Sequence, residues 1–160
     1  MSDFATAWNL CRQRFLDEIK DLRADQLNWR IHPESLSIGQ MAIHVAGVET
    51  LFASQLAGKE LSADEARLKT AATEGVVNDQ SFPFSDGEIG PDLVGSSLAS
   101  SRAMLEPLIT SPSPAVLTKE IKSALGPIIT GEGAFARMAF HSAYHQGQAY
   151  LIKTAPGFPS

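Results

Sequence analysis

Apolar residues recur every three or four positions along four stretches of the chain, and charged residues fall largely outside these stripes. Such spacing is typical of amphipathic helices, whose apolar side chains gather on one face. No strong alternation of apolar and polar residues indicates a strand between the stretches. The pattern therefore predicts an all-α fold, a four-helix bundle. The four predicted helices cover residues 3–23, 37–58, 92–110 and 130–154.

Two of the predicted helices carry clear end signals. Ser37 and Gln40 fit a capping box, in which each side chain accepts a hydrogen bond from a backbone N–H group at the helix start. Gly58 is a favourable stop for the same helix. Pro156 ends the last predicted helix because proline cannot continue the hydrogen-bond ladder.

The connections between the helices are long, so the pattern does not predict a simple up-down-up-down order. The longest is residues 59–90, in which residues 61–72 favour a short helix and Phe82-Pro83-Phe84 cannot continue one. Long loops in compact domains are often lids or binding loops. The segment is therefore expected either to cover a cleft, with Phe82 or Phe84 in its wall, or to anchor a crossover to the bundle.

Composition narrows the classes of function. The chain has 160 residues, which fits one domain spanning residues 1–160, and its formal net charge is −5. Without a basic cluster, this charge argues against binding of nucleic acid, although one or two arginines could still meet a small anionic substrate. No uncharged apolar run approaches the roughly 18–20 residues of a membrane span. The single cysteine and the charged N-terminal residues make the cytoplasm the expected location.

One familiar motif lacks its structural context. Residues 131–136 read G-x-G-x-x-A, the spacing of a dinucleotide-binding turn. The chain ends too soon after this motif for the second strand of the required βαβ unit. The Glu-x-x-His pair of di-iron bundles is also missing. We therefore predict neither a nucleotide site nor a carboxylate-bridged metal pair.

Three of the four histidines fall on apolar helical stripes. His141 and His145 are four residues apart, so they differ by roughly 40° around the helix and both rings can point at one ion. His44 lies on the stripe of another predicted helix, and the inner faces of helices meet in a bundle. Imidazole nitrogen favours zinc, nickel or iron(II) over magnesium or calcium. Three such ligands leave a coordination position open for water or substrate. His32, in a proline-bearing connection, is left out of this set.

An inward histidine can also be an ordinary core residue with a hydrogen-bonded neighbour. Three buried rings would then need three separate partners, which favours the metal site. Gln148, on the same stripe, could orient an imidazole or fill the core, and Tyr144 could contact a substrate or simply pack. No acidic residue shares either stripe, so the catalytic residues stay unknown, and a metal-bound water or thiolate is the expected nucleophile.

Two segments around these histidines resemble the DinB/YfiT-like superfamily. Residues 31–46, which contain a proline, a Ser-Ile helix start and His44 followed by valine, look like its second-helix signature. Residues 138–148, which read His-x-x-x-His followed by x-Gly-Gln, look like its last-helix signature. The resemblance implies a DinB-like four-helix bundle with one crossover, usually a homodimer. It also implies that His44, His141 and His145 hold one divalent transition metal.

Characterised members of the family include thiol-dependent S-transferases. The resemblance therefore implies a metal-dependent transferase or hydrolase that acts on a small molecule and in some members uses a low-molecular-weight thiol. The alternative is a non-enzymatic metal-binding bundle that acts as a dimeric stress or interaction protein. An exchangeable position on the metal favours the enzyme, whereas a fourth protein ligand would favour the alternative.

Overall fold

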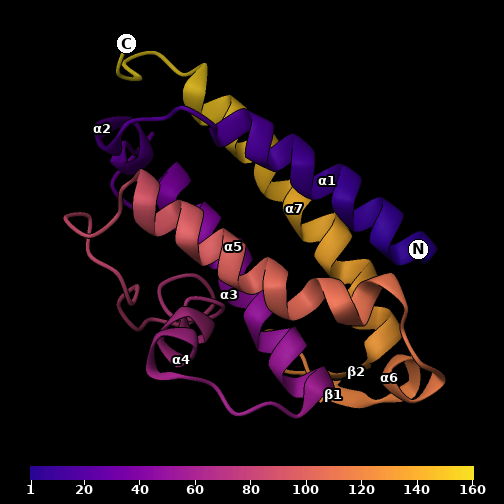
Figure 1. Cartoon of the computed structure of the whole chain (residues 1–160). Coiled ribbons are helices and arrows are strands. Elements are labelled where there is room, and N and C mark those ends of the chain that lie inside the picture. Colours follow the sequence, from indigo (N-terminus) through magenta and orange to yellow (C-terminus); the bar gives the residue numbers. More distant parts are fainter.

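Four long helices lie side by side in the computed structural model, which describes residues 1–160 and confirms the predicted all-α bundle (Figure 1). Three of them begin and end within about two residues of their predicted bounds. The first ends earlier, at Ile19, and Asp21 just beyond it has a left-handed φ of 63° that no helix continues. The long helices are α1 (Asp3–Ile19), α3 (Ile38–Ala57), α5 (Pro91–Thr110) and α7 (Gly131–Lys153).

One long crossover sets the order of these helices. α1 packs along α7, and α3 packs along both α5 and α7. α1 and α7 run parallel, because Phe4 meets Phe135 near their starts and Glu18 pairs with Lys153 near their ends. α3 and α5 are also parallel, so residues 58–90 return along the bundle between them (Figure 1). The long crossover connection expected from the sequence is therefore present.

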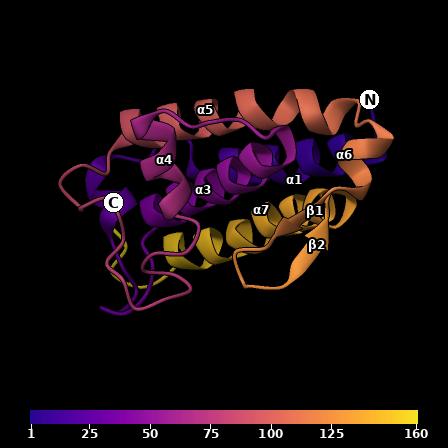
Figure 2. The same cartoon turned by 90° about the horizontal axis from the view of Figure 1, so that it is seen from below.

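Short elements occupy the connections. α4 is the short helix predicted within residues 61–72, whereas α2, α6 and a two-stranded hairpin were not predicted, because elements of three to five residues show no period. The strands pair antiparallel with Ile121 opposite Ile129, and the hairpin lies beside the first half of α7 (Figure 2). The G-x-G-x-x-A motif begins α7 directly after this hairpin, so no βαβ unit surrounds it. The short elements are α2 (Ala24–Asn28), α4 (Ala63–Thr70), α6 (Pro114–Thr118), β1 (Glu120–Lys122) and β2 (Ile128–Thr130).

Two apolar clusters fill the two ends of the bundle. One includes Phe15 and Ile43, where α3 and α5 begin, and the other includes Phe52 and Phe135 at the opposite end. Burial of these side chains is the main force that holds the helices together. None of the seven helices combines the length and the apolar character that a membrane span requires.

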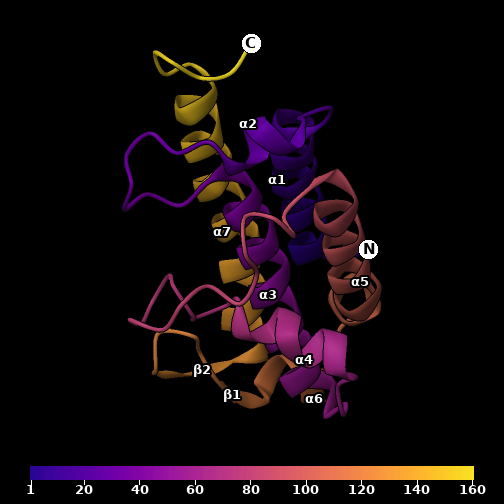
Figure 3. The same ribbon diagram turned by 90° about the vertical axis from the view of Figure 1, so that its left-hand side faces the viewer.

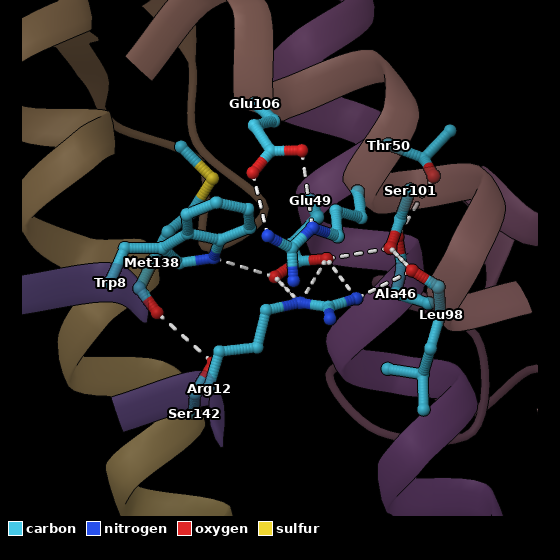
Figure 4. Close-up of polar contacts among 11 residues, drawn as sticks. Trp8, Arg12, Ala46, Glu49, Thr50, Leu98, Ser101, Glu106, Met138 and Ser142 are labelled. Carbon is cyan, nitrogen blue, oxygen red and sulfur yellow. Dashed lines mark hydrogen bonds and ion pairs between the residues drawn. The ribbon is translucent and has the colours of Figure 1, made fainter. Parts of the chain in front are cut away.

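A buried ion pair joins the helices between the two apolar clusters. Arg12, on the polar side of the first predicted helix, is nevertheless buried, and its Nε lies 3.0 Å from Glu49 Oε1. Trp8 Nε1 donates to the same oxygen at 2.8 Å, and Ser101 Oγ donates to Oε2 at 2.6 Å (Figure 4). Arg12 also donates to the carbonyl oxygen of Leu98. The two charges neutralise each other, and their hydrogen bonds connect α1, α3 and α5 in the region between the two apolar clusters.

The crossover is anchored to the bundle at Phe84. This side chain belongs to the apolar core, and the guanidinium of Arg67 in α4 lies 4.1 Å from its ring centre. Arg67 also donates to the carbonyl oxygen of Pro83 at 2.8 Å and pairs with Glu88 at 2.7 Å. Phe82 is only partly buried against the same core. These contacts favour the anchoring alternative over the cleft-covering one for this segment.

Replacing Phe84 with alanine is expected to lower the free energy of unfolding by about 3 kcal/mol, because a core aromatic side chain is lost. Urea unfolding followed by circular dichroism measures this change. Leu10→Ala is the control, since that α1 side chain is 58% exposed and its removal should change stability little. A Phe84→Ala protein of unchanged stability would contradict the anchoring role.

Candidate metal centre

The start of α3 is fixed by the predicted capping box. Gln40 N donates to Ser37 Oγ at 3.2 Å, and Ser37 N donates to Gln40 Oε1 at 3.1 Å. Nearly every side chain that follows in α3 is buried, because α4, α5 and α7 all pack against this helix. His44 therefore projects from the most enclosed helix of the bundle.

The three histidines on the predicted stripes converge between α3 and α7. His44 Nε2 lies 3.0 Å from His141 Nε2, which lies 3.1 Å from His145 Nε2. One ligand nitrogen from each ring lies within 4.8 Å of the other two. His44 and His145 are buried and His141 is partly exposed. His32 is exposed in the connection before α3 and lies outside the cluster, as expected.

Hydrogen bonds at the outer nitrogens determine which nitrogen of two rings faces the cluster. His44 Nδ1 lies 2.8 Å from the carbonyl oxygen of Ala71, and His145 Nδ1 lies 2.7 Å from Gln148 Oε1. Carbonyl and amide oxygens only accept, so each Nδ1 carries the proton and donates it. In both neutral rings, Nε2 therefore carries no proton, and its lone pair points toward His141.

This donor set fits a divalent transition metal. Lone pairs about 3 Å apart repel each other unless a cation or a proton lies between them. Tetrahedral coordination with metal–nitrogen bonds of about 2.0–2.1 Å would space the ligand nitrogens by about 3.3 Å. Two of the three observed separations, 3.0 and 3.1 Å, are close to this value, and the remaining pair, His44 and His145, lies within 4.8 Å. Imidazole ligands suit zinc, nickel or iron(II).

Loss of hydration keeps all three rings neutral, including the partly exposed ring of His141. Loss of hydration is the main cause that lowers the pKa of His141 to about 2, and the nearby His145 and His44 lower it further. The same loss of hydration lowers the pKa of His145 to about 4 and also lowers that of His44, whose hydrogen bond to Ala71 opposes the shift. Neutral imidazole is the form that binds metal, so the cluster is ready for an ion at neutral pH.

A glycine in α3 brings the Ala71 carbonyl against His44. A β-carbon at Gly47 would lie only 2.7 Å from the Leu68 carbonyl oxygen and 2.8 Å from Ala72 N. Because glycine has no β-carbon, α4 can end close against α3, and the Ala71 oxygen reaches His44 Nδ1. Neither Gly47 nor Ala71 was predicted, since a backbone acceptor leaves no side-chain signal. The available signal was a glycine one turn after His44 inside a predicted helix.

The remaining predicted residues differ in what they contact. Gln148 is hydrogen-bonded to His145, which fits the orienting role rather than core filling. Tyr144 is half-exposed, and its ring centre lies 5.1 Å from that of His145.

No carboxylate joins the three nitrogens, so no fourth protein ligand closes the site. Two surface hollows of about 610 and 380 Å³ lie along α4 and α5 and include none of the histidines.

Replacing Gln148 with leucine is expected to weaken metal binding by about 10- to 100-fold, because His145 loses the acceptor that fixes its tautomer and orientation. Competition with a chelator of known affinity measures the change. Gln146→Leu is the matched control on the same helix, and it should bind metal as the wild type does. Equal losses in both variants would contradict an orienting role for Gln148.

Comparisons with known proteins identify a family and a shared fold. A family model described as the DinB superfamily matches residues 7–149, a range that includes all three histidines. The crystal structure of a conserved protein from Enterococcus faecalis superimposes with a TM-score of 0.69 at 16% sequence identity. The superposition covers 94% of this chain and 92% of that chain, and it shows a shared fold. No curated protein matches the sequence.

Proposed function

Because the chain belongs to the DinB superfamily, we propose that it is a metal-dependent enzyme whose ligands are His44, His141 and His145. One observation carries the proposal. The three rings bring ligand nitrogens within 4.8 Å of one another, while Ala71 and Gln148 hold two of the rings by their outer nitrogens. Buried, neutral and oriented imidazoles are the arrangement that a bound transition metal requires.

The proposed reaction is transfer of a low-molecular-weight thiol to a small-molecule substrate, or hydrolysis of such a substrate. A divalent metal supplies Lewis acidity, which lowers the pKa of a bound water or thiol and polarises a carbonyl group. The absence of a fourth protein ligand supports an enzyme over a closed structural site. Ala71 and Gln148 hold the ligating tautomers, and burial of the rings excludes competing protons. No carboxylate stands at the cluster, so the protein offers no separate general base there.

The rival proposal is a dimeric metal-binding protein without catalysis. An exposed apolar face on α7 supports a second copy of the chain as partner: Phe140, Tyr144 and Leu151 are 68%, 52% and 64% exposed at helical spacing. This homodimer is compatible with either function.

Sedimentation at micromolar concentration should give about twice the chain mass of 17.2 kDa. A species of 17.2 kDa would count against the dimer.

Activity assays separate the two proposals. Protein stripped of metal and reloaded with zinc, nickel or iron(II) would be assayed for thiol transfer with small thiols and electrophilic acceptors. It would be assayed separately for hydrolysis with esters. We expect turnover that requires the metal and falls more than about 100-fold in His145→Ala, with His32→Ala as an unaffected control. Full turnover by metal-free protein would contradict the proposal. Metal-loaded protein that converts neither the thiol and acceptor pairs nor the esters would favour the non-enzymatic alternative.

A further inference from the structure

The β-hairpin lies on the same face of α3 as the metal centre. Gln55, eleven residues after His44, is about 20° from it around the helix and about 16 Å further along. The Gln55 side chain donates to the Lys122 carbonyl oxygen at 3.0 Å and accepts from Lys122 N at 2.9 Å. Figure 3 shows the hairpin turn projecting on the side where α3 and α7 lie together, as do the connections before α3 and after α4.

Arg137 stands between this hairpin and the histidines. It precedes His141 by one helical turn, about 6 Å along α7 and roughly 40° around it. Its Nη1 donates to Ser123 Oγ at 2.9 Å, and Ser123 is a buried residue of the hairpin turn. That contact fixes the guanidinium at one end of the face that carries the metal centre.

Arg137 has no counter-ion within the protein. The other arginines that are partly or fully buried, Arg12, Arg30 and Arg102, each pair with a carboxylate. Arg137 takes part in no ion pair, although it is partly buried. Ser123 is the only side chain to which its guanidinium donates, and the other N–H groups keep access to solvent. A partly buried guanidinium with free N–H donors attracts an anionic ligand from solution.

We propose that Arg137 binds the carboxylate of a small substrate whose reacting group meets the metal, an inference that rests on the proposed metal-dependent function. A planar guanidinium matches a carboxylate with two parallel hydrogen bonds, and its single charge balances a monoanion. The net charge of −5 repels anions at long range, so a local cation is needed to hold one. The rise of about 6 Å from Arg137 to His141 along α7 is comparable with the length of a substrate whose carboxylate lies roughly two or three carbon atoms from the reacting atom.

Two other polar groups on this edge of α7 can contact the same substrate. The Tyr144 hydroxyl and the Gln148 Nε2 have no hydrogen-bond partner in the protein, although Gln148 Oε1 is held by His145. Both residues lie within about 60° of His141 around the helix. Along the axis of α7, donors therefore stand both before and after His141, which favours a substrate rich in acceptor oxygens.

The test compares two thiols of nearly equal length on cobalt(II)-loaded protein. 3-Mercaptopropionate carries a carboxylate where 3-mercaptopropan-1-ol carries a neutral hydroxyl, and thiolate binding to cobalt is followed by visible absorption. Wild-type protein should prefer the carboxylate about 10- to 100-fold. Arg137→Gln should abolish this preference and leave the affinity for the neutral thiol unchanged, which also shows that the variant keeps an intact site. Arg14→Gln, an exposed arginine of α1, should retain the preference.

The outcomes separate this inference from the function on which it rests. Equal affinity of the wild type for the two thiols, binding of neither thiol, or a preference that survives Arg137→Gln would overturn the role of Arg137 while cobalt binding still supports the metal centre. Failure of cobalt to bind would overturn the metal centre itself, and the substrate assignment with it.

Discussion

Replacing Glu49 with alanine is expected to lower the free energy of unfolding by about 3–5 kcal/mol. The change leaves the guanidinium of Arg12 buried without its counter-ion and removes the acceptor of Trp8 Nε1 and Ser101 Oγ. An unpaired buried charge costs far more than the lost hydrogen bonds alone. Chemical unfolding followed by circular dichroism and tryptophan fluorescence measures the loss.

Glu106→Ala is the matched control for this prediction. Glu106 pairs with Arg102 at 2.6 Å, but both side chains are about two-fifths exposed, so its loss should change stability by less than about 1 kcal/mol. The double variant Arg12→Met/Glu49→Leu should recover most of the stability, since it removes both charges together. If Glu49→Ala destabilised the protein no more than Glu106→Ala, the buried pair would not have the role assigned to it.

The second large effect is a loss of stability of the metal-free protein in mild acid. The pKa of an unfolded histidine is about 6.5, whereas folding lowers the pKa of His141 to about 2 and that of His145 to about 4. Below pH 6.5 the unfolded chain therefore binds protons that the folded chain does not. Stability is full above this pH and falls by about 1.4 kcal/mol per pH unit for each ring. At pH 5 the two rings together cost on the order of 4 kcal/mol.

Unfolding of chelator-treated protein at pH 7 and at pH 5 measures this effect. The double variant His141→Gln/His145→Gln should lose much of the difference between the two pH values, whereas His32→Gln should keep it, since His32 is exposed. Equal stability of the metal-free wild type at both pH values would contradict the burial of neutral rings.

The sequence predicted the long helices and the histidine cluster because both rest on local periodicity. His141 and His145 face one direction for any helix that contains them, and His44 needed only a second helix with an inward stripe. The capping box that starts α3 was predicted for the same reason, since all its contacts lie within four residues. Each of these features follows from the periodicity within single helices and, for His44, from the packing of two inward faces.

What could not be predicted depends on contacts between distant segments. Arg12 pairs with a carboxylate 37 positions away, and charged residues are seldom buried, so the polar side of α1 gave no sign of burial. The acceptor for His44 is a backbone oxygen at the end of α4, which depends on how closely α4 packs against Gly47. The contact between Arg137 and Ser123 likewise requires a hairpin too short to be recognised from its sequence.

Metal content measured on untagged protein tests the central claim most directly. Elemental analysis of the wild type should find about one divalent transition metal ion per chain. His141→Ala should lose most of this metal, because removal of the middle ligand of the cluster leaves only two imidazoles, and His32→Ala should keep it all. Full retention of the metal by His141→Ala, or a wild type that binds none after reloading, would contradict the metal centre proposed for this chain.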